Sequence, residues 1–133
     1  MEKLEHIGIA VKNLEHSNVL FAKLLGRTHY KIETVESEGV KTSFFDLNGL
    51  KIELLEATHP DSPISKFIEK RGEGIHHLAF EVKDINASMK KYREDGFQLI
   101  HEKAKDGADN KNICFLHPKS TNGVLVELCQ EKK

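Results

Sequence analysis

Apolar and polar side chains alternate along residues 3–11 and again along residues 74–82. This period of two is typical of β-strands with one buried face. After each strand, apolar residues recur every three or four positions, and an Asn or Asp precedes the first of them. That spacing predicts two amphipathic helices with N-capping residues Asn13 and Asp84, over residues 14–25 and 85–95.

β-rich stretches separated by turn residues fill most of the remaining chain. The strands predicted from them cover residues 28–36, 40–47, 50–56, 97–103, 112–117 and 123–129. The turns are marked by Gly39, Asn48-Gly49, Asp106-Gly107 and Asn122-Gly123. A short helix is expected in between, because Ser62 suits an N-cap, Pro63 the first helical position and Gly72 the end.

The chain contains an internal repeat, which is informative about the whole fold. The segment from His6 to Leu14 aligns without a gap with the segment from His77 to Ile85, shifted by 71 residues. The segment Asn48–Leu54 aligns with Asn122–Leu128, shifted by 74 residues. The second copy therefore carries three extra residues, which we place in the loop around residues 117–121.

Two βαβββ modules follow from this repeat, and neither can bury both faces of a four-stranded sheet alone. We predict an α+β fold in one domain: module 1–58, connecting helix segment 59–72 and module 73–131. Side by side, the modules would form an eight-stranded, curved, partly closed mixed sheet with the helices outside.

Strand alternation places four ionisable side chains on the concave face of this predicted sheet. They are His6, Glu53, His77 and Glu127. A single histidine or glutamate here would be explained as an ordinary polar residue. A His and a Glu repeated in matched register instead predict a divalent metal site, because imidazole and carboxylate donors suit Mn, Fe, Co, Ni or Zn.

Composition narrows the function classes. The chain has 133 residues, 38% of them hydrophobic and 31% charged, which indicates a globular protein. Its formal net charge is -1, so nucleic-acid binding is disfavoured. No apolar run approaches a membrane span, and residues 1–11 do not read as a secretory signal. With Cys114 and Cys129 expected to be free and half-buried, we predict a cytoplasmic protein.

Several longer motifs resemble the vicinal oxygen chelate superfamily, which includes glyoxalase I and the extradiol dioxygenases. Within it the chain most resembles the methylmalonyl-CoA epimerase family, over nearly its whole length. The most specific stretches are Asp61-Ser-Pro-Ile, Gly74-Ile-His-His and Phe115-Leu-His-Pro-Lys-Ser. This resemblance implies the glyoxalase fold and an isomerase that interconverts the two C2 epimers of methylmalonyl-CoA through an enolate.

The resemblance also assigns roles to residues. It implies the metal ligands His6, Glu53, His77 and Glu127, with Co or Mn expected first and Zn, Ni or Mg as other options. We expect Glu127 to transfer the C2 proton as well, with Glu53 as its partner on the opposite face of the substrate. Some epimerases carry Gln at the position of Glu53 and a proton-transferring Glu at that of Thr42. Since Thr42 has no usable base, another carboxylate must take that role here.

Acyl-CoA binding and a homodimer are further implications of this resemblance. Lys119, Ser120 and Lys111 are the candidate substrate-binding residues, with either lysine facing a CoA phosphate. Two other functions stay open. One is a glyoxalase I-like isomerase of glutathione hemithioacetals, and the other is a metal-free small-molecule binding module of the same fold. An extradiol dioxygenase is disfavoured, because it needs only three ligands.

Overall fold

A computed structural model describes residues 1–132. By internal contacts it divides into two units. The first unit is His6–His76, and the second combines Met1–Glu5 with the chain from His77 onward. Both boundaries fall inside strands, one within β1 (Lys3–Ala10) and one within β5 (Gly74–Glu81).

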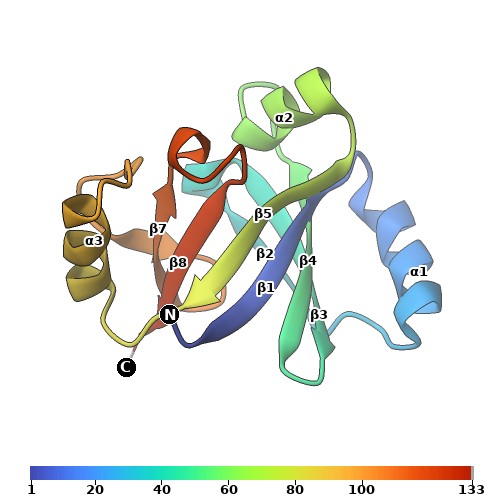
Figure 1. Ribbon diagram of the computed structural model, residues 1–133. Coiled ribbons are helices and arrows are strands. Elements are labelled where there is room, and N and C mark those ends of the chain that lie inside the picture. Colours follow the sequence, from blue (N-terminus) through green and yellow to red (C-terminus); the bar gives the residue numbers. More distant parts are fainter. Residues whose placement is uncertain (133) are drawn as a thin grey trace. The chain divides into compact units, whose positions relative to one another are not determined.

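The first unit contains a four-stranded sheet in the order β2-β3-β4-β1 (Figure 1). Strand β1 pairs in parallel with β4, and the other two pairings are antiparallel. After β1 the elements are α1 (Leu14–Leu25), β2 (Lys31–Val35), a 3-10 turn η1 (Glu36–Glu38), β3 (Val40–Leu47), β4 (Leu50–Ala57) and α2 (Pro63–Arg71).

The second unit repeats this topology with the strand order β5-β8-β7-β6, in which β5 pairs in parallel with β8. Its elements after β5 are α3 (Ile85–Glu94), β6 (Lys105–Gly107), β7 (Lys111–Leu116), a 3-10 turn η2 (Pro118–Ser120) and β8 (Val126–Glu131). The βαβββ repeat predicted from the sequence is thus confirmed. None of the helices formed by residues 1–132 is long and apolar enough to cross a membrane.

The segment after α3 differs from the prediction. Residues 97–103 were expected to form a strand, but only Leu99 forms an isolated bridge, to Leu116. The guanidinium of Arg93 donates to the carbonyls of His101 and Glu102, which engages these two carbonyls outside the sheet. The short strand β6 comes later and includes Asp106 and Gly107, which were predicted as a turn.

The hairpin turn between β6 and β7 instead contains Asp109 and Asn110, both with positive φ, at 59° and 56°. These are residue types that tolerate the left-handed conformation. Gly107 is required for packing, since a Cβ atom there would lie 2.7 Å from Cγ2 of Ile113. Strand β8 begins at Val126, three residues later than predicted, because Thr121 and Val124 still belong to the preceding turn.

Each sheet has a helix face and a site face. On the helix face of the first unit, Phe45, Ile52 and Leu54 are buried in one cluster with Leu14 of α1. On that of the second unit, Cys114, Leu116 and Leu128 are buried with Ile85 and Met89 of α3. The opposite face, which we call the site face, carries His6 and Glu53 in the first unit and His77 and Glu127 in the second. On it, α2 packs Ile64 against Ala10 and Leu55.

The repeat extends to the start of helices α1 and α3. The predicted caps are confirmed, since the Asn13 side chain accepts from the His16 N–H at 2.9 Å and that of Asp84 from the Ala87 N–H at 3.1 Å. A second acceptor reaches the first helical N–H. It is Oε1 of Glu56 for Leu14, at 2.7 Å, and Oε1 of Gln130 for Ile85, at 2.8 Å. These bonds fasten each helix to the last strand of its module.

Removing the second acceptor tests this arrangement. We expect Glu56→Ala to lower the free energy of unfolding by about 1 kcal/mol, the usual cost of losing a helix cap. Glu56→Gln keeps the oxygen that the second module uses and should unfold within about 0.5 kcal/mol of the wild type. Urea unfolding followed by circular dichroism measures both changes. An equal loss of unfolding free energy in the two variants would show that the carboxylate charge, and not the capping oxygen, stabilises the helix.

Candidate functional site

A histidine and a glutamate meet on the site face of the first unit. In the parallel register of β1 and β4, Gly8 is opposite Glu53, which places the glutamate beside His6 two residues earlier. Nδ1 of His6 lies 3.1 Å from Oε2 of Glu53. Both residues are only 5% exposed.

The second unit repeats this pair. Ala79 of β5 is opposite Glu127 of β8, and Nε2 of His77 lies 3.2 Å from Oε1 of Glu127. Both residues are buried. The ring of Phe115 packs edge-on against His77, with 5.7 Å between ring centroids, and holds the imidazole in place. His76 instead packs on Phe67, at 5.0 Å, as expected for the histidine not assigned to the site.

The donor chemistry of the two pairs fits a divalent transition metal. Each pair brings one imidazole nitrogen and one carboxylate oxygen to within about 3 Å of each other, as two ligands of one ion would be. Such a buried pair is costly to desolvate unless it is well compensated. The same donor set occurs in both units, and its imidazole and carboxylate groups are of the kind that a divalent transition metal accepts.

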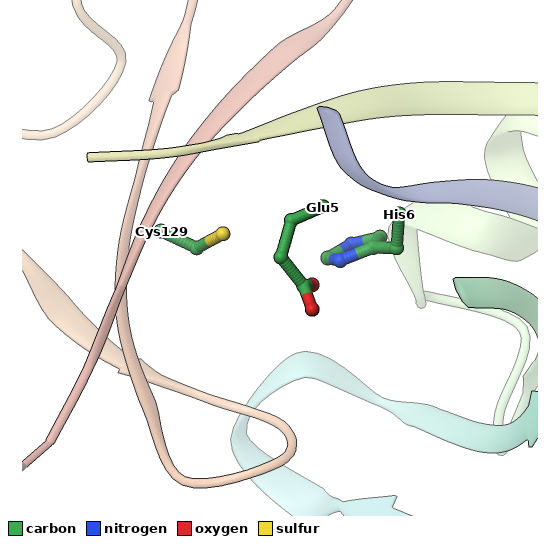
Figure 2. A group of neighbouring side chains, drawn as sticks. All are labelled: Glu5, His6 and Cys129. Carbon is green, nitrogen blue, oxygen red and sulfur yellow. The ribbon is translucent and has the colours of Figure 1, made fainter. Parts of the chain in front are cut away.

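Glu5 and Lys111 are also buried, although their burial was not predicted from the sequence. Among residues 1–132 the buried Asp, Glu, His and Lys side chains are Glu5, His6, Glu53, His77, Lys111 and Glu127. The Glu5 carboxylate and the Cys129 thiol come within 4.8 Å of each other in the second unit (Figure 2). A signal existed for Glu5, because it occupies the same alternating positions of strand β1 as the apolar Ile7 and Ile9.

The predicted substrate-binding residues are in different environments. Lys119 is exposed, and its backbone N–H donates to Nδ1 of His117 at 3.0 Å. The Ser120 hydroxyl donates to the His117 carbonyl at 2.9 Å and accepts from the Gln98 N–H at 3.2 Å, so it orders this loop. Lys111 belongs to strand β7 and is buried, which differs from a solvated loop lysine.

Thr42 is fully covered in strand β3, where it is opposite Leu55 of β4. A hydroxyl group offers no proton acceptor of useful strength at neutral pH. Thr42 therefore offers no general base on this strand, as its side-chain chemistry already indicated.

Both cysteines are free, as predicted, but they are fully buried and not half-buried. Cys114 lies on the helix face, where desolvation by burial raises the pKa of its thiol above the ordinary value. Two effects oppose this shift of the pKa without cancelling it. They are the positive charges of Arg93 and Lys105 and a hydrogen bond from the His101 backbone. Cys129 lies on the site face, with its thiol 3.6 Å from the Phe80 carbonyl oxygen.

Comparisons with known proteins agree on one family. The model of the Glyoxalase/Bleomycin resistance protein/Dioxygenase superfamily matches residues 5–115. Ethylmalonyl-CoA/methylmalonyl-CoA epimerase of Cereibacter sphaeroides is 39% identical over 96% of this chain and 97% of its own length. The uncharacterized protein YqjC of Bacillus subtilis is also 39% identical, over 99% of this chain and 94% of its own length.

Solved structures extend this likeness to the fold. A variant of Streptomyces coelicolor methylmalonyl-CoA epimerase in complex with 2-nitronate-propionyl-CoA is similar with a TM-score of 0.95 and 31% identity. The match covers 98% of this chain and 95% of that one. The fold class predicted from the sequence is confirmed.

The environment of the two thiols generates a prediction about their reactivity. A thiol must ionise and meet solvent to react, and here burial prevents solvent contact and, at Cys114, raises the pKa. We expect iodoacetamide at pH 8 to leave the native protein unmodified while two thiols react after unfolding in urea. Mass spectrometry of the intact chain counts the adducts. Rapid modification of either cysteine in the folded protein would contradict the burial described here.

Proposed function

The chain belongs to the Glyoxalase/Bleomycin resistance protein/Dioxygenase superfamily and, within it, to the family of the methylmalonyl-CoA epimerases, and we propose that it interconverts the two C2 epimers of methylmalonyl-CoA. The observation that carries this proposal is the duplicated His–Glu pair on the site faces. Relatives named as methylmalonyl-CoA epimerases match almost the whole chain, and solved epimerase structures contain an analogue of this acyl-CoA ester.

We propose that His6, Glu53, His77 and Glu127 together hold one divalent ion, with Co or Mn as the first choices. When bound, such an ion would supply a Lewis acid that neutralises the negative charge developing on the substrate during proton removal. The buried ligands keep bulk water away, which strengthens this charge stabilisation. Four protein donors leave room on an octahedral ion for the substrate.

The reaction also needs groups that move a proton. The C2–H bond lies between a thioester and a carboxylate, and its cleavage places an electron pair on the enolate. Epimerisation requires the proton to leave one face and another to arrive at the opposite face. We assign this transfer to Glu127, with Glu53 of the other module as its partner on the opposite face. A carboxylate bound to a cation would be a weak base, so the carboxylate that moves the proton would have to be held loosely or to swing away from the ion.

We propose in addition that the substrate is an acyl-CoA ester and that the protein acts as a homodimer in the cytoplasm.

Metal-dependent exchange at C2 tests the reaction class. We expect the metal-loaded protein to wash deuterium from D₂O into C2 of methylmalonyl-CoA while the epimers interconvert, because enolate formation exposes the acidic position to solvent. Chelator treatment should abolish both processes, and NMR follows them together. A metal-loaded protein without exchange would discard this substrate and favour glutathione hemithioacetals. Protein that binds no metal and catalyses no exchange would favour a binding module.

Glutamine substitutions test the proton-transfer groups. Glu127→Gln retains an oxygen donor but cannot accept a proton, so turnover should fall by about 10²- to 10⁴-fold while the fold survives. The same result is expected for Glu53→Gln. Glu56→Gln is the matched control, because Glu56 lies on the same strand as Glu53 but caps helix α1. This variant should epimerise at the wild-type rate. Full activity in both Glu127→Gln and Glu53→Gln would refute the assignment.

A further inference from the structure

Helix α1 exposes apolar side chains on its outer face. Val19, Leu20 and Leu24 are 56%, 54% and 71% exposed. Leu20 and Leu24 are four residues apart, so they are neighbours along one line of the helix surface, and Val19 flanks this line. Single exposed apolar residues are common on proteins, but neighbouring ones that form a patch are typical of surfaces that another molecule covers.

The internal repeat shows that the fold does not require these apolar residues. With the shift of 71 residues, the corresponding positions in the second module are charged and exposed. They are Lys90 and Lys91 of α3 and Asp95 at its C-cap. Because α3 occupies the same place in the same βαβββ topology, a helix here folds with a charged outer face. The apolar outer face is therefore a property of α1 alone.

The inner side of α1 differs from that of α3 in the opposite sense. Asn18 of α1 and Ser43 of β3 are buried, and neither Oδ1 of Asn18 nor the Ser43 hydroxyl has a hydrogen-bond partner among residues 1–132. The corresponding residues of the second module are Met89 and Cys114, which belong to its apolar cluster. Buried polar atoms without partners are costly. The sheet of the first unit therefore stabilises α1 less than the second sheet stabilises α3.

The charges beside the apolar row suit a second copy of the same helix. Glu15, Val19 and Lys23 follow one another at a spacing of four residues, and the two charged side chains are exposed. This line is negative at one end and positive at the other, with Val19 in the middle. When two such helices lie antiparallel about a two-fold axis at Val19, each Glu15 is level with the partner's Lys23. An isologous contact of this kind uses the same patch on both copies.

We propose that the outer face of α1 is the contact surface between two copies of this chain, which pair through antiparallel α1 helices. This inference rests on the homodimer of the proposed function and not on the proposed reaction. Stable interfaces have an apolar centre and a polar rim, and they bury about 800 Å² of each partner. Val19, Leu20 and Leu24 supply the centre, and Glu15 and Lys23 belong to the rim.

Replacing the apolar row by residues of the second module tests the surface. A double variant with Leu20→Lys and Leu24→Asp carries what α3 has at these positions, so it should fold with the circular dichroism of the wild type. The wild type should sediment as a dimer, and the dissociation constant of the variant should be about 100-fold higher or more, because two apolar anchors are lost from each copy. Sedimentation velocity measures both. Ile100→Lys is the matched control, since Ile100 is also an exposed apolar residue, at 47%, but lies outside α1. This variant should dimerise like the wild type.

Exchanging the rim charges tests the antiparallel pairing. Glu15→Lys and Lys23→Glu each place like charges level with each other in the two copies, and each should raise the dissociation constant about threefold or more. The combined variant exchanges both charges and restores the attraction, so its dissociation constant should return close to the wild-type value. The helix dipole cannot explain this recovery, because each substitution opposes the dipole and the two effects would accumulate.

Three results would overturn the inference. They are a wild type that sediments as a monomer, a variant with Leu20→Lys and Leu24→Asp that dimerises like the wild type, and a combined charge variant that dimerises no better than the single ones. Epimerisation measured on the same samples separates this inference from the reaction. Turnover together with one of these results would leave the proposed reaction intact, and α1-dependent dimers without turnover would leave only this inference.

Discussion

A buried carboxylate must find a partner, and this constraint organises both halves of the molecule. Glu53 and Glu127 occupy equivalent positions on the last strand of their modules, and each meets a histidine from the first strand at 3.1 to 3.2 Å. The parallel pairing of first and last strands makes this meeting possible, because it brings residues more than 40 positions apart into register. The helices, caps and apolar clusters on the other face keep that register.

Most of this arrangement could be predicted because the internal repeat contains the same residues at equivalent positions in both modules. A single alternating strand does not say which of its polar residues is functional, but His6 and His77 occur at the same place in two aligned strands. The same comparison identified Glu53 and Glu127. The capping residues Asn13 and Asp84 could be predicted as well, because a helix N-cap depends on hydrogen bonds to residues nearby in the sequence.

The features that escaped prediction depend on tertiary contacts. Residues 97–103 have the composition of a strand, but Arg93 donates to the carbonyls of His101 and Glu102, a contact that the local pattern does not reveal. Nor does any pattern show that Lys111 is covered or that Glu5 approaches Cys129, because burial of a charged side chain is decided by distant parts of the chain. Of these exceptions, Lys111 and the contact with Cys129 lie on the site face, where function tolerates locally unfavourable choices.

Our central proposal is that the two His–Glu pairs bind a single ion. Native mass spectrometry with Co²⁺ should therefore find one ion per chain in the wild type. His6→Ala and His77→Ala should each weaken its binding by a similar factor, since each removes one ligand of the same centre. Two ions per chain, or a substitution in one pair that leaves binding by the other pair at full strength, would contradict the account.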